Sequence, residues 1–188
     1  NHWQEVSHAW RQHLCQLSCL LHPWRLVDST PQTSKTVEGQ LRAELQAIET
    51  RLETNGLPMK KDTLAKVQKQ LAGISALVDF WGQTVRPDLT QLAMTPRWTQ
   101  WAEEWLLPLA YWQEQLRRTR HPVQKAQIAL VLQAVEEAFE RHPCTLKLTP
   151  ELLAGWKAWA AAHAKAFQRA SAALEGPNGY LSQMQHNH

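Results

Sequence analysis

Apolar residues recur at every third or fourth position along almost the whole chain, and this spacing constrains the fold more than any other feature of the sequence. Such spacing places apolar side chains on one face of an α-helix, whereas a half-buried strand needs strict alternation of apolar and polar residues. The stretches with helical spacing span residues 3–21, 37–52, 64–85, 98–116, 122–139 and 152–174. We therefore predict an all-α fold, a single bundle of about six helices with short loops.

Proline, glycine and capping residues mark the expected ends of these helices. Residues 23–34 are polar and contain proline, so they are predicted to form a loop. Gly56 provides a helix stop because glycine tolerates the left-handed conformation. Asp62 is expected to cap the next helix. A threonine followed by proline, at residues 95–96 and again at 149–150, is typical of a helix start.

Two prolines, one just after the third apolar stretch and one inside the fourth, are expected to end or interrupt helices. Proline has no amide hydrogen and its ring clashes with the carbonyl of the fourth residue before it. Pro87 is therefore predicted to end the third helix, since it also restricts the residue before it. Pro108 is predicted to kink or divide the fourth helix.

Composition places the chain among globular proteins. Its 188 residues are 44% hydrophobic, which is enough for one ordinary domain with a core. The net charge of +3, from 20 basic and 17 acidic side chains, is far weaker than that of a dedicated nucleic-acid module, although a local patch can still bind phosphates. Three cysteines make a disulfide framework improbable and favour a reducing, cytoplasmic compartment. No apolar run is long enough for a transmembrane helix, so no membrane partner is expected.

Tryptophan is unusually abundant, with ten residues against three phenylalanines. Tryptophan buries a large area but needs a partner for its indole N–H, so packing in a core is the leading interpretation. Stacking of exposed tryptophans on nucleic-acid bases is the alternative.

The densest basic cluster consists of Arg117, Arg118, Arg120 and Lys125, with His121 among them. It follows the tryptophan-bearing helix, where cations also interact favourably with the helix dipole. That structural explanation stands beside a functional one, in which the cluster contacts DNA phosphates and binding weakens as salt is added.

Cysteine and histidine also gather near the start of the chain, at Cys15, Cys19 and His22. Cys15 and Cys19 lie one helical turn apart and could share a soft metal ion. Structural zinc sites normally pair two such knuckles, however, and Cys144 is far along the chain. Burial of the cysteines as small apolar residues is therefore the preferred interpretation.

The C-terminal segment, residues 170–188, carries Glu175-Gly176-Pro177-Asn178 followed by Gly-Tyr-Leu-Ser-Gln. It resembles the C-terminal region of a bacterial DDE-type transposase family with an RNase H-like core. Residues 22–34, 77–81 and 106–113 resemble the helical part that precedes the last acid in that family. The family usually has a basic residue where this chain has Pro177, so either the helix breaks at Gly176 or the acid is misplaced.

The resemblance implies roles for two residues. Glu175 would be the last catalytic acid and a ligand of Mg²⁺ in a two-metal site for DNA strand transfer, and Asn178 would contact DNA or support the acid. The family needs two further aspartates on strands. The chain offers Asp28, Asp62, Asp79 and Asp88, all in predicted loops, caps or helices, and none is expected to be catalytic.

The resemblance also implies a domain organisation and a function. Residues 1–169 would be a helical insertion, and residues 170–188 would begin the segment that bears the last acid. The chain is then expected to be a piece of a larger transposase that binds transposon-end DNA, as a homo-oligomer in the intact enzyme, and to be inactive alone. The alternative is a non-enzymatic helical module, derived from a transposase, that binds DNA or a protein partner.

Overall fold

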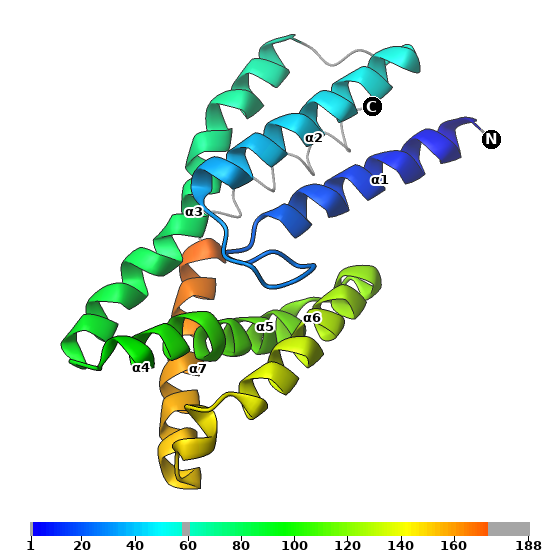
Figure 1. The fold of residues 1–188 in the computed structure, drawn as a ribbon. Helices are drawn as coiled ribbons and strands as arrows, with labels where there is room; N and C mark the ends of the chain where they lie inside the picture. Colours follow the sequence, from blue (N-terminus) through cyan, green and yellow to red (C-terminus); the bar gives the residue numbers. More distant parts are fainter. Residues whose placement is uncertain (1, 58–60, 173–188) are drawn as a thin grey trace. The chain divides into compact units, whose positions relative to one another are not determined.

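The computed structural model describes residues 2–57 and 61–172, and over these residues the chain is helical without any strand (Figure 1). The predicted all-α class is confirmed, as is the number of about six helices, because α4, η1 and α5 follow one another without a break. The chain divides into two compact units, residues 1–83 and 84–188, whose boundary lies inside α3. The domain boundary expected near residue 169 falls in the last turns of α7 and stays a prediction.

The first unit contains α1 (His2–Leu20), α2 (Ser34–Thr54) and most of α3 (Lys61–Gln91). Helices α1 and α2 lie side by side (Figure 1). His13 and Glu44 join them through a 2.5 Å contact between Nδ1 and Oε1. The core of this unit is formed by apolar side chains of α2 and α3, namely Val37, Leu41, Leu45, Leu71 and Val78. These residues recur at helical spacing, so the apolar periodicity of the sequence predicted which residues form this core.

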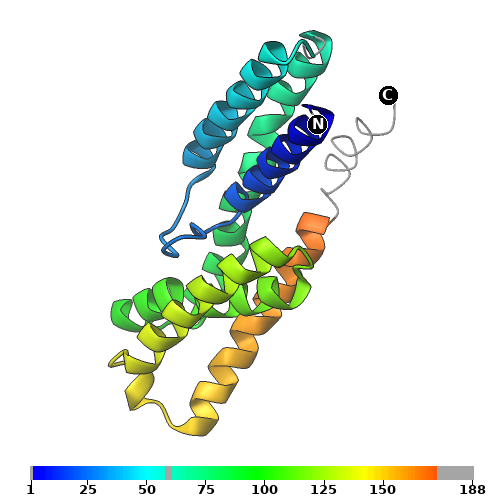
Figure 2. The same cartoon turned by 90° about the vertical axis from the view of Figure 1, so that its right-hand side faces the viewer.

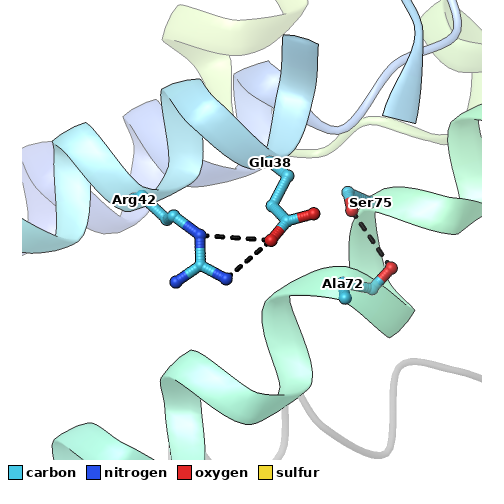
Figure 3. A network of polar contacts seen from close by, with 4 residues as sticks. All are labelled: Glu38, Arg42, Ala72 and Ser75. Atoms are coloured by element: carbon cyan, nitrogen blue, oxygen red, sulfur yellow. Dashed lines mark hydrogen bonds and ion pairs between the residues drawn. The ribbon is translucent and has the colours of Figure 1, made fainter. Parts of the chain in front are cut away.

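Polar groups at the junction of α2 and α3 are satisfied locally. Arg42 donates from Nε and Nη2 to one oxygen of Glu38, one turn away on α2 (Figure 3). The hydroxyl of Ser75, which is only 1% exposed, donates to the carbonyl of Ala72 on its own helix (Figure 3). A buried hydroxyl without such a partner would destabilise the fold, and here the helix itself provides one.

The segment between α1 and α2 is a loop, as predicted, and it has a defined conformation. Trp24 and Pro31 form an isolated antiparallel bridge, and the amide of Arg25 donates to the carbonyl of Thr30 at 2.8 Å. Asp28 accepts bonds from the hydroxyl and the amide of Thr30, at 2.8 and 3.1 Å, and these bonds lower the pKa of its carboxyl. Ser29 completes the turn with a positive φ of 57°.

Two contacts fix this loop against α3. Trp24 is buried and meets Trp81 edge to face, with 5.4 Å between ring centroids. Asp79 accepts bonds from the amide of Ser34 at 2.9 Å and from its hydroxyl at 2.5 Å. The first amides of a helix have no partner within the helix. Thr33 is the N-cap of α2 and accepts from the amide of Thr36, and Asp79 caps the amide of Ser34 from a neighbouring helix.

We expect Asp79→Ala to lower the free energy of unfolding of the first unit by about 1–2 kcal/mol, because it removes a helix cap and leaves the Ser34 amide without its acceptor. Urea denaturation followed by circular dichroism measures this loss. The matched control is Glu53→Ala, which removes an exposed carboxylate from α2 and should change stability by less than about 0.5 kcal/mol. Equal effects of the two substitutions would contradict the capping role.

The start and the end of α3 differ from expectation. Asp62 lies in the first turn of the helix and is not its cap. Pro87 lies inside α3, which continues to Gln91, so the predicted end was wrong. Val85 and Leu89 are both buried and one turn apart. Their packing offsets the hydrogen bond that proline removes, and tertiary contacts thus override the local preference.

The second unit contains the end of α3, then α4 (Pro96–Trp101), the π-helical turn η1 (Ala102–Leu106) and α5 (Leu107–Arg118). It continues with α6 (Pro122–Arg141), the short 3₁₀ turn η2 (Thr145–Lys147) and α7 (Pro150–Ala172). The turn that contains η2 joins α6 to α7 (Figure 2). Helix α5 lies at the centre, because it packs against both α6 and α7 and is buried nearly all round.

The interruption expected at Pro108 takes the form of the π-helical turn just before it. Proline cannot donate to the carbonyl four residues back, and the amide of Leu107 bonds to the carbonyl of Ala102, five residues back. The helix from Pro96 to Arg118 therefore continues through the proline.

The core of the second unit is aromatic and is built around Trp101, which is 1% exposed. Its indole N–H donates to the hydroxyl of Thr145 at 2.9 Å. Its ring stacks on Phe139 of α6, with 5.7 Å between centroids, and meets Trp156 of α7 edge to face at 6.1 Å. Trp101 thus connects α4 with α6, with η2 and with α7, in agreement with the prediction that tryptophan serves packing.

Candidate functional site

The predicted basic cluster lies where α5 ends and α6 begins. Arg117 and Arg118 occupy the last turn of α5, Arg120 lies in the connecting link, and Lys125 lies in the first turn of α6. All four side chains are exposed, and α6 starts at a proline as its sequence predicts. The cluster is therefore a continuous stretch of the surface at the corner between two helices.

Arg117 differs from the other cations because a buried carboxylate holds it. Its Nε donates to Oε2 of Glu114 at 3.0 Å, and its Nη2 donates to Oε1 at 2.6 Å. The Glu114 side chain is 7% exposed, whereas the Arg117 side chain is 65% exposed. A two-bond arrangement of this kind fixes the plane of the guanidinium. The hydrogen bond from Arg117 lowers the pKa of Glu114, so this carboxylate is ionised at neutral pH.

Smaller contributions come from two other cations. The positive charge of Arg118 and, last in size, that of Lys165 on α7 also lower the pKa of Glu114, after the hydrogen bond and the charge of Arg117.

Two sequence-predicted residues, Glu175 and Asn178, lie outside the described residues. Of the four aspartates discussed with Glu175, Asp62 lies in the first turn of α3, and the other three have contacts of their own. Asp28 binds Thr30, Asp79 caps α2, and Asp88 is 3.1 Å from Nε2 of His163. Over residues 2–57 and 61–172, no three side chains of the types that bind metals come together.

Cys15 and Cys19 lie on α1, and His22 lies in the loop that follows it. Cys15 and Cys19 are only partly buried, so the predicted burial of the cysteines holds fully for Cys144 alone, in the second unit. Burial lowers the pKa of His22 to about 4, so its imidazole is neutral at pH 7. Cys144 therefore fits the predicted role of a small core residue.

Three half-buried tryptophans of the second unit, Trp98, Trp156 and Trp159, also contact other aromatic rings. Trp98 meets Trp101 edge to face, and Trp156 meets Trp159 in the same way, with centroid distances of 5.4 and 5.7 Å. Trp159 in turn contacts His163, at 4.7 Å. These half-buried rings pack on one another, which is the structural role that the sequence favoured over base stacking.

Comparison with known proteins places part of the chain in relation to a family. Residues 102–188 match the model of a family described as a family of unknown function (DUF6399). The match spans less than half of the chain and contains α5, α6, α7 and the basic cluster. Neither the curated proteins nor the solved structures include a significant match.

The described helices were also compared with the requirements for crossing a membrane. None of them combines the length and the apolar character that a membrane-spanning helix needs.

Proposed function

We propose that the second unit binds DNA through the phosphate backbone, using the basic cluster at the corner between α5 and α6. The observation that carries this proposal is the contrast within the cluster. Arg117 is paired with Glu114, whereas no ion pair among the described residues involves Arg118, Arg120 or Lys125. Exposed cations without a neutralising partner can exchange their counterions for phosphates.

The helix dipole explains only part of this arrangement. Arg117 and Arg118 lie in the last turn of α5, where a positive charge is favourable. Lys125 lies in the first turn of α6, where the same effect disfavours a cation. A cluster that continues from a favourable helix end to an unfavourable one is better accounted for by an anionic ligand than by helix stability alone.

Within the intact protein, we propose that this DNA is the end of a transposon and that the helical region supports a transposase. The support is the resemblance of residues 170–188 to the segment that bears the last acid of DDE-type transposases. Glu175 would act as that acid and Asn178 would lie beside the DNA. A cytoplasmic location and a homo-oligomeric enzyme accompany this proposal.

The described residues do not fit the Mg²⁺ site that such an enzyme needs. Asp28, Asp79 and Asp88 each have another partner, and they are not gathered into a common group. A two-metal site needs several carboxylates around ions about 3.5–4 Å apart. The remaining acids would have to come from elsewhere in the intact enzyme, and the chain alone is proposed to be catalytically inactive.

A salt series tests the DNA-binding proposal. We expect the chain to bind a fluorescein-labelled DNA duplex at low salt, with log K falling linearly as log salt rises. The slope should be about −3 to −4, since the cluster offers three or four cations and each phosphate contact contributes about −0.9. Fluorescence anisotropy between roughly 20 and 200 mM salt measures this slope, because phosphate-binding proteins lose affinity steeply over this range.

Absent binding, or binding that does not depend on salt, would contradict the DNA role. Such a result would favour the protein-binding alternative. Val123 and Leu130 of α6 are 57% and 70% exposed, and their spacing of two helical turns places them on one face where a partner could bind.

A further inference from the structure

The carboxylate of Glu114 occupies an unusual position for a residue in a basic cluster. It is almost completely buried, it is ionised, and it accepts two hydrogen bonds from Arg117. A carboxylate here lowers the positive charge of a surface that is proposed to bind an anion. Charge alone would therefore disfavour Glu114 at this position.

The geometry of the pair gives Glu114 a different role. A guanidinium carries five N–H donors on three nitrogens. Glu114 engages Nε and Nη2, so Nη1 remains for another acceptor, on a side chain that is 65% exposed. Because both bonds lie in one plane, they also hold the guanidinium in one orientation.

Arg117 holds Glu114 through two hydrogen bonds, and Arg118 follows Arg117 in the last turn of α5.

We propose that Glu114 positions Arg117 for a phosphodiester of the bound nucleic acid. This inference rests on the proposed DNA binding and adds Glu114, a residue that the sequence did not indicate. An arginine that is already ordered loses less side-chain entropy when it binds phosphate, so the Glu114 pair increases affinity although it removes net charge.

The two interpretations of Glu114 predict opposite changes in DNA affinity, which makes the test decisive. Glu114→Gln keeps the size of the side chain, raises the net charge by one and removes one acceptor of the two-bond arrangement. If charge alone matters, this variant binds DNA more tightly than the wild type. If Glu114 positions Arg117, the variant binds roughly three- to tenfold more weakly, as expected when one long side chain must be ordered on binding.

The experiment measures the affinity of the full chain for a labelled DNA duplex by anisotropy over a salt series. The control is Glu103→Gln, which makes the same charge change at an exposed position of η1. It should bind as tightly as the wild type or slightly more tightly. Arg117→Lys, which keeps the charge but cannot form the two-bond arrangement, should weaken binding to a similar degree as Glu114→Gln.

Circular dichroism establishes that each variant is folded, and Arg117→Lys replaces Glu114→Gln if the latter does not fold. Equal or tighter binding by Glu114→Gln, or normal binding by Arg117→Lys, would overturn the inference. If the wild type itself does not bind in a salt-dependent way, the proposed function fails, and the inference fails with it.

Discussion

Trp101→Ala is expected to lower the free energy of unfolding of the second unit by about 3–5 kcal/mol, the usual range for deleting a large buried aromatic side chain. Trp101 is 1% exposed and contacts Phe139 of α6 and Trp156 of α7. Its removal also leaves the hydroxyl of Thr145 without the indole donor. Because domains are stable by only about 5–15 kcal/mol, this loss is a large fraction of the total.

Two further variants separate the causes of that loss. Trp101→Phe keeps most of the aromatic contact but cannot donate to Thr145, and it should cost less than Trp101→Ala. Trp98→Ala removes a half-buried ring from the same cluster and should cost less than either loss at Trp101. Urea denaturation followed by far-ultraviolet circular dichroism gives the three values. A loss below about 1 kcal/mol for Trp101→Ala would show that Trp101 does not organise this core.

The helical framework could be predicted from the sequence because it depends on short-range patterns. Helix α2 illustrates this, since its apolar stripe and its stop at Asn55-Gly56 agree with the structure, where Gly56 has a φ of +72°. The exceptions come from packing. Pro87 does not end α3 because Val85 and Leu89 are buried, and Pro108 is accommodated by a π-helical turn that no local pattern indicates.

The polar contacts between distant residues could not be predicted from the sequence. Asp79 caps α2 across 45 residues of sequence, and its position on α3 shows no feature of a cap. This contact depends on how α3 is rotated about its own axis, whereas the apolar periodicity indicates only which face of a helix is buried.

Residues 22–34 and 77–81 lie together in the first unit. They contact each other through Trp24 with Trp81 and Ser34 with Asp79. Asp79 therefore has a structural role in that unit.

The largest change in DNA affinity is expected from neutralising the basic cluster. The variant with Arg118→Gln, Arg120→Gln and Lys125→Gln lacks three exposed cations that have no ion-pair partner among the described residues. Its DNA affinity should fall, and its salt slope should become shallower by about 2–3, since each lost phosphate contact removes about 0.9. Its stability should change little, because exposed substitutions of this kind usually have small effects.

A charge-matched comparison tests the central claim, that DNA binds at the corner between α5 and α6. The control carries Arg51→Gln, Lys66→Gln and Lys69→Gln, three exposed cations of the first unit, and loses the same net charge. Both variants and the wild type are titrated with one labelled DNA duplex over the same salt series. We predict a weak interaction with a slope shallower by about 2–3 for the cluster variant and a nearly wild-type slope for the control. Equal loss in the two variants would contradict the claim, because binding would then follow total charge and not this site.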